Sequence, residues 1–157
     1  MKVEKKILLF VNDSYFSYLS AQKIIESHYD NIKLIVFSKA TISSSKKILK
    51  ILKKTSFSYF IYRFFIQVLT ILFYRKKSVE YLANKFHIKK TYVRNSRDLT
   101  EIIEYGHLGL AFNFDLLIRK NIIDKFENGI YNIHASKLPK DKGISPVLWA
   151  FARGDTE

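Results

Sequence analysis

The sequence contains no cysteine and only five glycines among its 157 residues. The absence of cysteine excludes disulfide bonds and thiolate metal sites. The chain also lacks a Gly-x-Gly-x-x-Gly stretch after its first apolar run, which excludes the familiar dinucleotide-binding fingerprint. The four histidines show no spacing typical of a metal site, so we expect no metal. The first apolar run is too short for a secretory signal, so we expect a cytoplasmic protein.

Acidic residues are scarce relative to basic ones, and the net charge of +13 raises the question of a nucleic-acid partner. The charge is unevenly distributed along the chain. Residues 111–157 carry seven Lys or Arg and six Asp or Glu, a net charge of +1, so the remaining +12 lies in residues 1–110. The abundance of lysine, isoleucine and asparagine is a skew that genome composition can produce. The charge therefore does not by itself indicate nucleic-acid binding.

What is present is a pattern of apolar strands and helices in a chain of the size of one domain. Residues 7–11 are a continuous apolar run, typical of a strand buried on both faces of a parallel sheet. Asn12, Asp13 and Ser14 then offer helix N-cap chemistry, and residues 32–37 form a second apolar strand. Strand, helix and strand at this spacing make a βαβ unit. We therefore predict an α/β fold, with a mostly parallel sheet flanked by helices.

The remaining chain continues the alternation of strands and helices. We predict helices over residues 78–86 and from 98 to near Gly106, strands over 88–93, 108–112 and 129–134, an exit turn at 113–115, and a short helix or turn over 116–126. The sequence shows no internal repeat and no low-complexity linker. One domain over residues 1–157 is therefore expected.

An apolar and aromatic stretch at residues 57–74 approaches the length of a membrane span. It follows a basic amphipathic segment at residues 46–54. Polar side chains recur along it at helical spacing and line one stripe: Arg63, Gln67, Thr70 and Tyr74. This periodicity favours an amphipathic helix over a lipid-embedded one. We expect the helix to cover the sheet, and peripheral membrane contact through its aromatic residues and flanking lysines is the alternative.

The most informative stretch follows the last predicted strand. Asn132 and His134 are two residues apart, and alternate side chains of a strand share one face. The two should therefore point the same way, with Ile133 in the core. A carboxamide can hold a developing oxyanion, and an imidazole can move a proton near neutral pH. The pair predicts acyl-transfer chemistry.

A longer pattern begins at Asn132. Its positions are Asn132, His134, Ser136, Leu138, Pro139, Gly143, Pro146 and Trp149, followed by Gly154-Asp155. This pattern resembles the signature of the folate-dependent formyltransferases, in the N-terminal catalytic domain of the methionyl-tRNA formyltransferase and sugar N-formyltransferase type. The resemblance is close over residues 110–157 and general upstream. It implies a Rossmann-like sheet, 10-formyltetrahydrofolate as the formyl donor and a primary amine as the acceptor.

The resemblance also implies roles for individual residues. Asn132 would donate to the formyl oxygen, and His134 would move the proton of the amine. In the family, the turn after the 108–112 strand contacts the folate head group. Its apolar residues are therefore candidates for lining a pterin pocket, with ordinary packing as the alternative for each: Phe112, Phe114, Leu116 and Leu117. Ser136, Pro139 and Gly143 would shape the loop that follows the motif.

One departure from the family pattern concerns a carboxylate. The family completes its site with an aspartate some tens of residues beyond the histidine, where it orients the imidazole. This sequence stops at Glu157, and neither Asp141 nor Asp155 matches that group. We expect a catalytic domain that is incomplete at its C-terminus and weakly active or inactive alone. A truncated fragment, a broken reading frame and a shortened protein with another role are the three explanations.

The acceptor is predicted from the spacing within the motif. Pro146-x-x-Trp149 resembles the tRNA and sugar branches of the family more than the purine branch. A nucleotide-linked amino sugar is the predicted substrate, because the first half of the chain does not match the long basic loop of the tRNA enzyme. Methionyl-tRNA is the alternative acceptor. A non-catalytic folate-binding or membrane-surface module, with residues 46–74 as its contact, is the alternative function, and the oligomeric state is not predicted.

Overall fold

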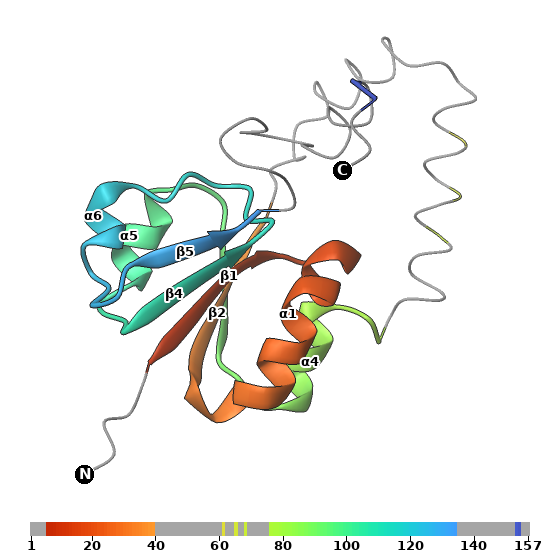
Figure 1. Cartoon of the computed structure of the whole chain (residues 1–157), viewed down its shortest axis with the longest axis horizontal. Helices are drawn as coiled ribbons and strands as arrows, with labels where there is room; N and C mark the ends of the chain where they lie inside the picture. Colours follow the sequence, from red (N-terminus) through yellow and green to blue (C-terminus); the bar gives the residue numbers. More distant parts are fainter. Residues whose placement is uncertain are drawn as a thin grey trace.

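The protein is described by a computed structural model that places residues 6–39, 61, 65, 68, 76–134 and 153–154. These residues form a five-stranded sheet in the order β3-β2-β1-β4-β5, and all four strand pairs are parallel (Figure 1). The predicted α/β fold with a mostly parallel sheet is confirmed. The elements are β1 Ile7–Asn12, α1 Tyr15–His28, the short 3₁₀ helix η1 Tyr29–Asn31, β2 Ile32–Ser38, α4 Val79–Lys85, β3 Lys90–Val93, α5 Asp98–Ile102, β4 Leu108–Phe112, α6 Lys120–Ile123 and β5 Ile130–Ile133.

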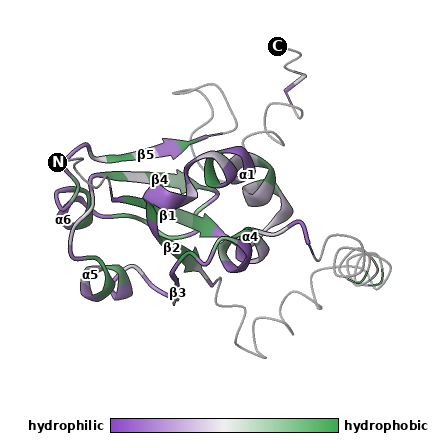
Figure 2. Cartoon of the chain, turned by 90° about the horizontal axis from the view of Figure 1, so that it is seen from below, coloured by the Kyte–Doolittle hydropathy of each residue, from purple (hydrophilic) through white to green (hydrophobic). Residues whose placement is uncertain are grey.

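The central strand β1 explains why its sequence is a continuous apolar run. Successive side chains of a strand point to opposite faces, so Leu8 and Phe10 enter one hydrophobic cluster while Leu9 and Val11 enter the other. All four are buried. Figure 2 shows the strands running between the helix pair α1 and α4 and the helix pair α5 and α6. Helices on both faces of a parallel sheet leave little of the central strand to water.

Helices α1 and α4 cover the first face. Ala21 and Ile25 of α1 and Leu82 of α4 pack against that face of the sheet. Ser14 is the N-cap of α1, since its hydroxyl accepts a hydrogen bond from the backbone N–H of Ser17 at 3.2 Å. The N-cap predicted at this strand exit is confirmed, and such a cap stabilises a helix by about 1 kcal/mol.

Helices α5 and α6 cover the second face. Phe10 makes edge-to-face contacts with the rings of Phe114 and Phe126, at centroid distances of 5.5 and 6.0 Å. Lys125, after α6, donates from its ammonium group to the carbonyl oxygens of Thr100 and Ile103. Helix α5 ends earlier than predicted, because the backbone turns to an extended conformation at Ile103. The Lys125 ammonium group thus donates to carbonyl oxygens that have no hydrogen-bond donor within the helix.

The apolar stretch at residues 57–74 lies mostly outside the described residues. Within it, Ile61, Phe65 and Val68 are helical, which agrees with the predicted helix. All three side chains are exposed. The expected contact of this stretch with the sheet falls on the other residues and lies outside the described part of the chain. Among the described residues, no helix is both long and apolar enough to cross a membrane.

Candidate functional site

The carboxyl ends of the parallel strands meet at one edge of the sheet. In the strand register Asn12 of β1 lies beside Ser38 of β2, and Phe112 of β4 lies beside Ile133 of β5. Figure 1 shows these strand ends at the same side of the sheet. Ligands of open α/β sheets bind outside this edge, so it is the candidate site.

The predicted catalytic pair lies at this edge. Asn132 belongs to β5, opposite Ala111 of β4, and its side chain is exposed. His134 directly follows the strand and is half-buried. Both residues therefore lie where the sequence predicted, at the end of an apolar strand, and their chemical roles stay a prediction.

The expectation that Ile133 packs in the core is wrong. Its side chain is 47% exposed. Strand β5 is the last strand in the sheet order and pairs with β4 alone among the described strands. An outermost strand has a neighbouring strand on one side only, so an apolar side chain on it is covered less than one on a central strand.

The turn after β4 holds the residues predicted to line a folate pocket. Phe112 is buried in the core cluster with Leu9 and Val11. Phe114 and Leu116 are half-buried and pack against the cluster on the other face. Leu117 is 72% exposed. Of the four candidates, Leu117 presents the most side-chain surface to a ligand, whereas Phe112 could contribute through its backbone.

The residues predicted to shape the loop lie outside the described part of the chain. These are Ser136, Pro139 and Gly143, together with Asp141 and Asp155. Their roles stay predictions.

Asp115 is the residue at this edge to which the sequence pattern gives no role. Its carboxylate accepts a hydrogen bond from the Asn12 amide at 3.2 Å and another from the Ser38 hydroxyl at 3.0 Å. Its backbone N–H donates to the same Ser38 hydroxyl at 3.3 Å. These bonds join the ends of β1 and β2 to the turn after β4.

Two serines extend this network into helix α1. Ser14 and Ser17 each donate from the hydroxyl to the Asn12 amide oxygen at 2.6 Å. Ser17 is fully buried and also reaches the carbonyl oxygen of Phe112 at 3.4 Å. Asn12, with its oxygen held by the serines, is oriented so that its amide nitrogen faces Asp115. Asn12 and Ser14 belong to the polar cluster that the sequence flagged as a helix cap, but nothing local to it points to Asp115.

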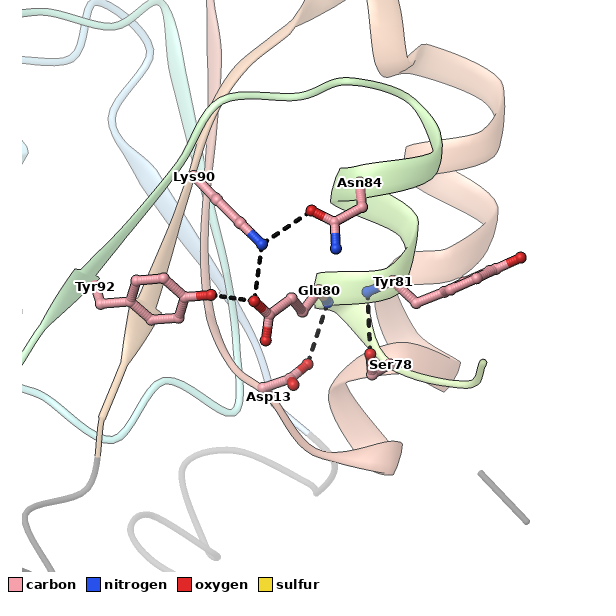
Figure 3. A network of polar contacts seen from close by, with 7 residues as sticks. All are labelled: Asp13, Ser78, Glu80, Tyr81, Asn84, Lys90 and Tyr92. Atoms are coloured by element: carbon pink, nitrogen blue, oxygen red, sulfur yellow. Dashed lines mark hydrogen bonds and ion pairs between the residues drawn. The ribbon is translucent and has the colours of Figure 1, made fainter. Parts of the chain in front are cut away.

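A second polar cluster lies between α4 and β3 (Figure 3). Glu80 accepts from the Lys90 ammonium group at 2.8 Å and from the hydroxyl of Tyr92. The hydrogen bond from Lys90, followed by that from Tyr92, lowers the pKa of Glu80. The same bond to Glu80 raises the pKa of Lys90. These groups satisfy one another, so the cluster ties the helix to the strand.

Asp13 connects this cluster to the site edge. Its carboxylate accepts a hydrogen bond from the backbone N–H of Glu80 at 3.2 Å. Burial is the largest influence on the Asp13 carboxyl and raises its pKa.

Within the described ranges, no three His, Asp or Glu side chains come together as a metal site would require.

The comparison with known families shows which family the chain belongs to. The family model described as formyl transferase matches residues 5–157. The chain belongs to this family. The resemblance read from the motif at Asn132 is confirmed.

Curated relatives of the chain in this family are methionyl-tRNA formyltransferases. The one from Finegoldia magna is 40% identical over 60 residues, which are 38% of this chain and 16% of that protein. The one from Borrelia garinii is 31% identical over 78 residues, 49% of this chain and 25% of that protein. The matched segments thus span a quarter or less of these two relatives.

Solved structures of formyltransferases share the fold. Glycinamide ribonucleotide transformylase 1 from Symbiobacterium toebii has a TM-score of 0.58 and 13% identity, and the match covers 98% of this chain and 62% of that chain. The corresponding enzyme from Geobacillus kaustophilus has a TM-score of 0.51 and 14% identity, with coverage of 97% and 69%. The predicted Rossmann-like architecture of the formyltransferase type is confirmed.

Proposed function

We propose that this chain transfers a formyl group from 10-formyltetrahydrofolate to a primary amine. The observation that carries the proposal is the place of Asn132 and His134, at the carboxyl edge of a parallel sheet in a chain of the formyl transferase family. Ligands of such sheets bind at that edge. An amide donor and an imidazole there suit acyl transfer.

Asn132 would stabilise charge on the formyl oxygen. As the amine nitrogen bonds to the formyl carbon, that oxygen gains negative charge, and the Asn132 amide N–H donates to it. Loss of such a donor typically costs about 3–4 kcal/mol of transition-state stabilisation. Asn132 belongs to strand β5, so its backbone is paired with β4 at the point where the side chain begins.

His134 would handle the proton. The attacking amine must lose a proton, and the folate nitrogen that leaves must gain one when its bond to the formyl carbon breaks. An imidazole can accept the first proton and deliver the second, since it titrates near neutral pH. Such a role contributes roughly 10²–10⁴ in rate.

The turn at residues 113–117 would receive the folate head group. Its exposed apolar residue, Leu117, and the backbone beyond the buried Phe112 are the surfaces that it offers. An aromatic ring system with polar edges is bound well by apolar side chains together with a few backbone groups.

The acceptor that we propose is a nucleotide-linked amino sugar. The Pro146-x-x-Trp149 spacing resembles the tRNA and sugar branches of the family, and the first half of the chain does not match the long basic loop of the tRNA enzyme. Methionyl-tRNA is the second candidate, and it is favoured by the names of the two curated relatives. The net charge of +13 suits either a tRNA backbone or a diphosphate. Incubation with 10-formyltetrahydrofolate and each acceptor in turn separates the two by which one becomes formylated.

The catalytic proposal is tested with Asn132→Ala and His134→Ala in single-turnover assays with protein in excess. Each substitution should lower the rate at least about a hundredfold. Asn121→Ala, on the exposed surface of α6, and His28→Ala, at the end of α1, are matched controls that should leave the rate unchanged. Unchanged rates in the first two variants would refute the assignment of catalysis to this pair.

A further inference from the structure

Asp115 links the predicted folate-binding turn to two other strands. Its two carboxylate oxygens accept from Asn12 and Ser38, which lie 103 and 77 residues away in the sequence. Ser38 is 6% exposed, and its hydroxyl both donates to the carboxylate and accepts from the Asp115 backbone N–H. Backbone and side chain of one turn residue are thus held by a single buried hydroxyl.

We propose that Asp115 is a positioning residue that fixes the turn at residues 113–117 for the formyl donor. This inference rests on the proposed function. The turn begins at Asn113, whose backbone is left-handed, with φ of +50°. Asparagine is one of the few residues besides glycine that adopt this conformation readily, so the chain can change direction here.

The turn is anchored at two residues between Asn113 and Leu117. Phe114 packs edge-to-face on the core residue Phe10, and Asp115 makes the hydrogen bonds to β1 and β2. Leu117 follows these two anchors and is left exposed. Anchors on two neighbouring residues fix the position of the turn relative to the carboxyl ends of β1 and β2. The donor would then meet a preformed surface rather than order the turn itself, which lowers the cost of binding.

The geometry separates Asp115 from the catalytic histidine. In the sheet order, β1 and β2 lie on one side of β4, and β5 lies on the other. The carboxylate of Asp115 is engaged toward β1 and β2, whereas His134 follows β5. While it makes these bonds, Asp115 does not serve as the carboxylate that orients the imidazole. Its effect should therefore reach the reaction through donor binding.

The amide variant distinguishes positioning from acid–base chemistry. In Asp115→Asn the side-chain oxygen can still accept from Asn12, and the new NH₂ group can donate to the Ser38 hydroxyl, which has free acceptor capacity. The variant keeps the geometry and loses the charge. A residue that acts by its charge or its proton would fail in this variant, whereas an anchor would be rescued.

The experiment measures binding of 10-formyltetrahydrofolate to the full chain by calorimetry, and then KM for the donor and kcat. Asp115→Ala should raise the donor Kd about tenfold, the equivalent of one to two hydrogen bonds. The donor KM should rise in parallel, with a smaller change in kcat. Asp115→Asn should bind within about twofold of the parent chain, since it retains both bonds. Asp124→Ala, which removes an exposed aspartate paired with Lys120, is the matched control and should change nothing.

Ser38→Ala is a second variant that tests the same anchor, should the Asp115→Ala chain fail to fold. It removes the hydroxyl that holds the turn, so it should also weaken donor binding, and its effect should not add to that of Asp115→Ala. Parent-like donor affinity in both alanine variants overturns the inference and leaves the proposed function standing. An amide variant as defective as the alanine variant also overturns it. A parent chain that does not bind the donor overturns the proposed function and this inference together.

Discussion

Ser17→Ala should destabilise the protein although it replaces a small residue by a better helix former. Ser17 is fully buried in α1, and its hydroxyl donates to the amide oxygen of Asn12 at 2.6 Å. It also lies 3.4 Å from the carbonyl oxygen of Phe112. The substitution therefore weakens the link between the helix and the ends of β1 and β4.

The magnitude follows from these partners. Leaving buried polar groups without a hydrogen bond costs about 1–3 kcal/mol. The lower half of this range applies here, because Ser14 still donates to Asn12 and the bond to Phe112 is long. Alanine regains up to about 0.5 kcal/mol through its helix propensity. A net loss of about 1 kcal/mol in the free energy of unfolding is expected.

Ser20→Ala is the matched control for this prediction. Ser20 lies on the same helix, is exposed, and among the described residues bonds to the carbonyl oxygen of Phe16, one turn earlier, at 2.9 Å. This change should be neutral or stabilising by up to about 0.5 kcal/mol. Urea unfolding of both variants, followed by circular dichroism, gives the difference directly. A Ser17→Ala chain as stable as the Ser20→Ala chain would refute the reasoning that the buried hydroxyl holds this edge together.

Two further predictions concern packing and pH. Gly109→Ala should lower the free energy of unfolding by about 1–3 kcal/mol, since the added Cβ would lie 2.7 Å from Cγ1 of Ile130 on the neighbouring strand. Denaturant titration measures this change. An unchanged free energy of unfolding would show that β5 is not packed so closely against β4. The pKa of Glu80 is lower in the folded chain than its usual value of 4.5. The Glu80 carboxylate therefore contributes its stability above pH 4.5, and this contribution is lost as the pH falls through the lowered pKa of the folded state. Unfolding midpoints measured from pH 6 downward should therefore fall less steeply in Glu80→Gln than in the parent chain, and parallel curves would contradict the assigned partnership with Lys90.

Much of the fold could be predicted because its signals are local. The 7–11 run is apolar at every position because β1 is the central strand, and the bounds of β4 coincide with the predicted 108–112 run. The positions of Asn132 in β5 and of His134 directly after it could be predicted for the same reason, since a strand end is visible in the sequence. The exposure of Ile133 was not predictable, because it depends on β5 being outermost among the described strands.

The part that local patterns could not reveal is the contact between distant segments. Asp115 and Ser38 are 77 residues apart, and neither stands in a motif. Their bond exists because β2 and β4 lie on either side of β1 and end at the same edge. Strand order decides such a pairing, and a single sequence gives strand positions without giving their order. The early end of α5 at Ile102 also depends on a contact between distant segments, because Lys125, which follows α6, donates to the carbonyl oxygen of Ile103.

The measurement that tests the central claim most directly is the location of the bound formyl donor. Amide chemical shifts of the labelled chain, recorded during titration with 10-formyltetrahydrofolate, report which residues the ligand meets. The largest changes should fall on the turn at residues 113–117 and on Asn132 and His134, at the carboxyl edge of the sheet. Changes confined to the opposite edge, around Gly106 and His107, or no change at saturating donor, would contradict the account.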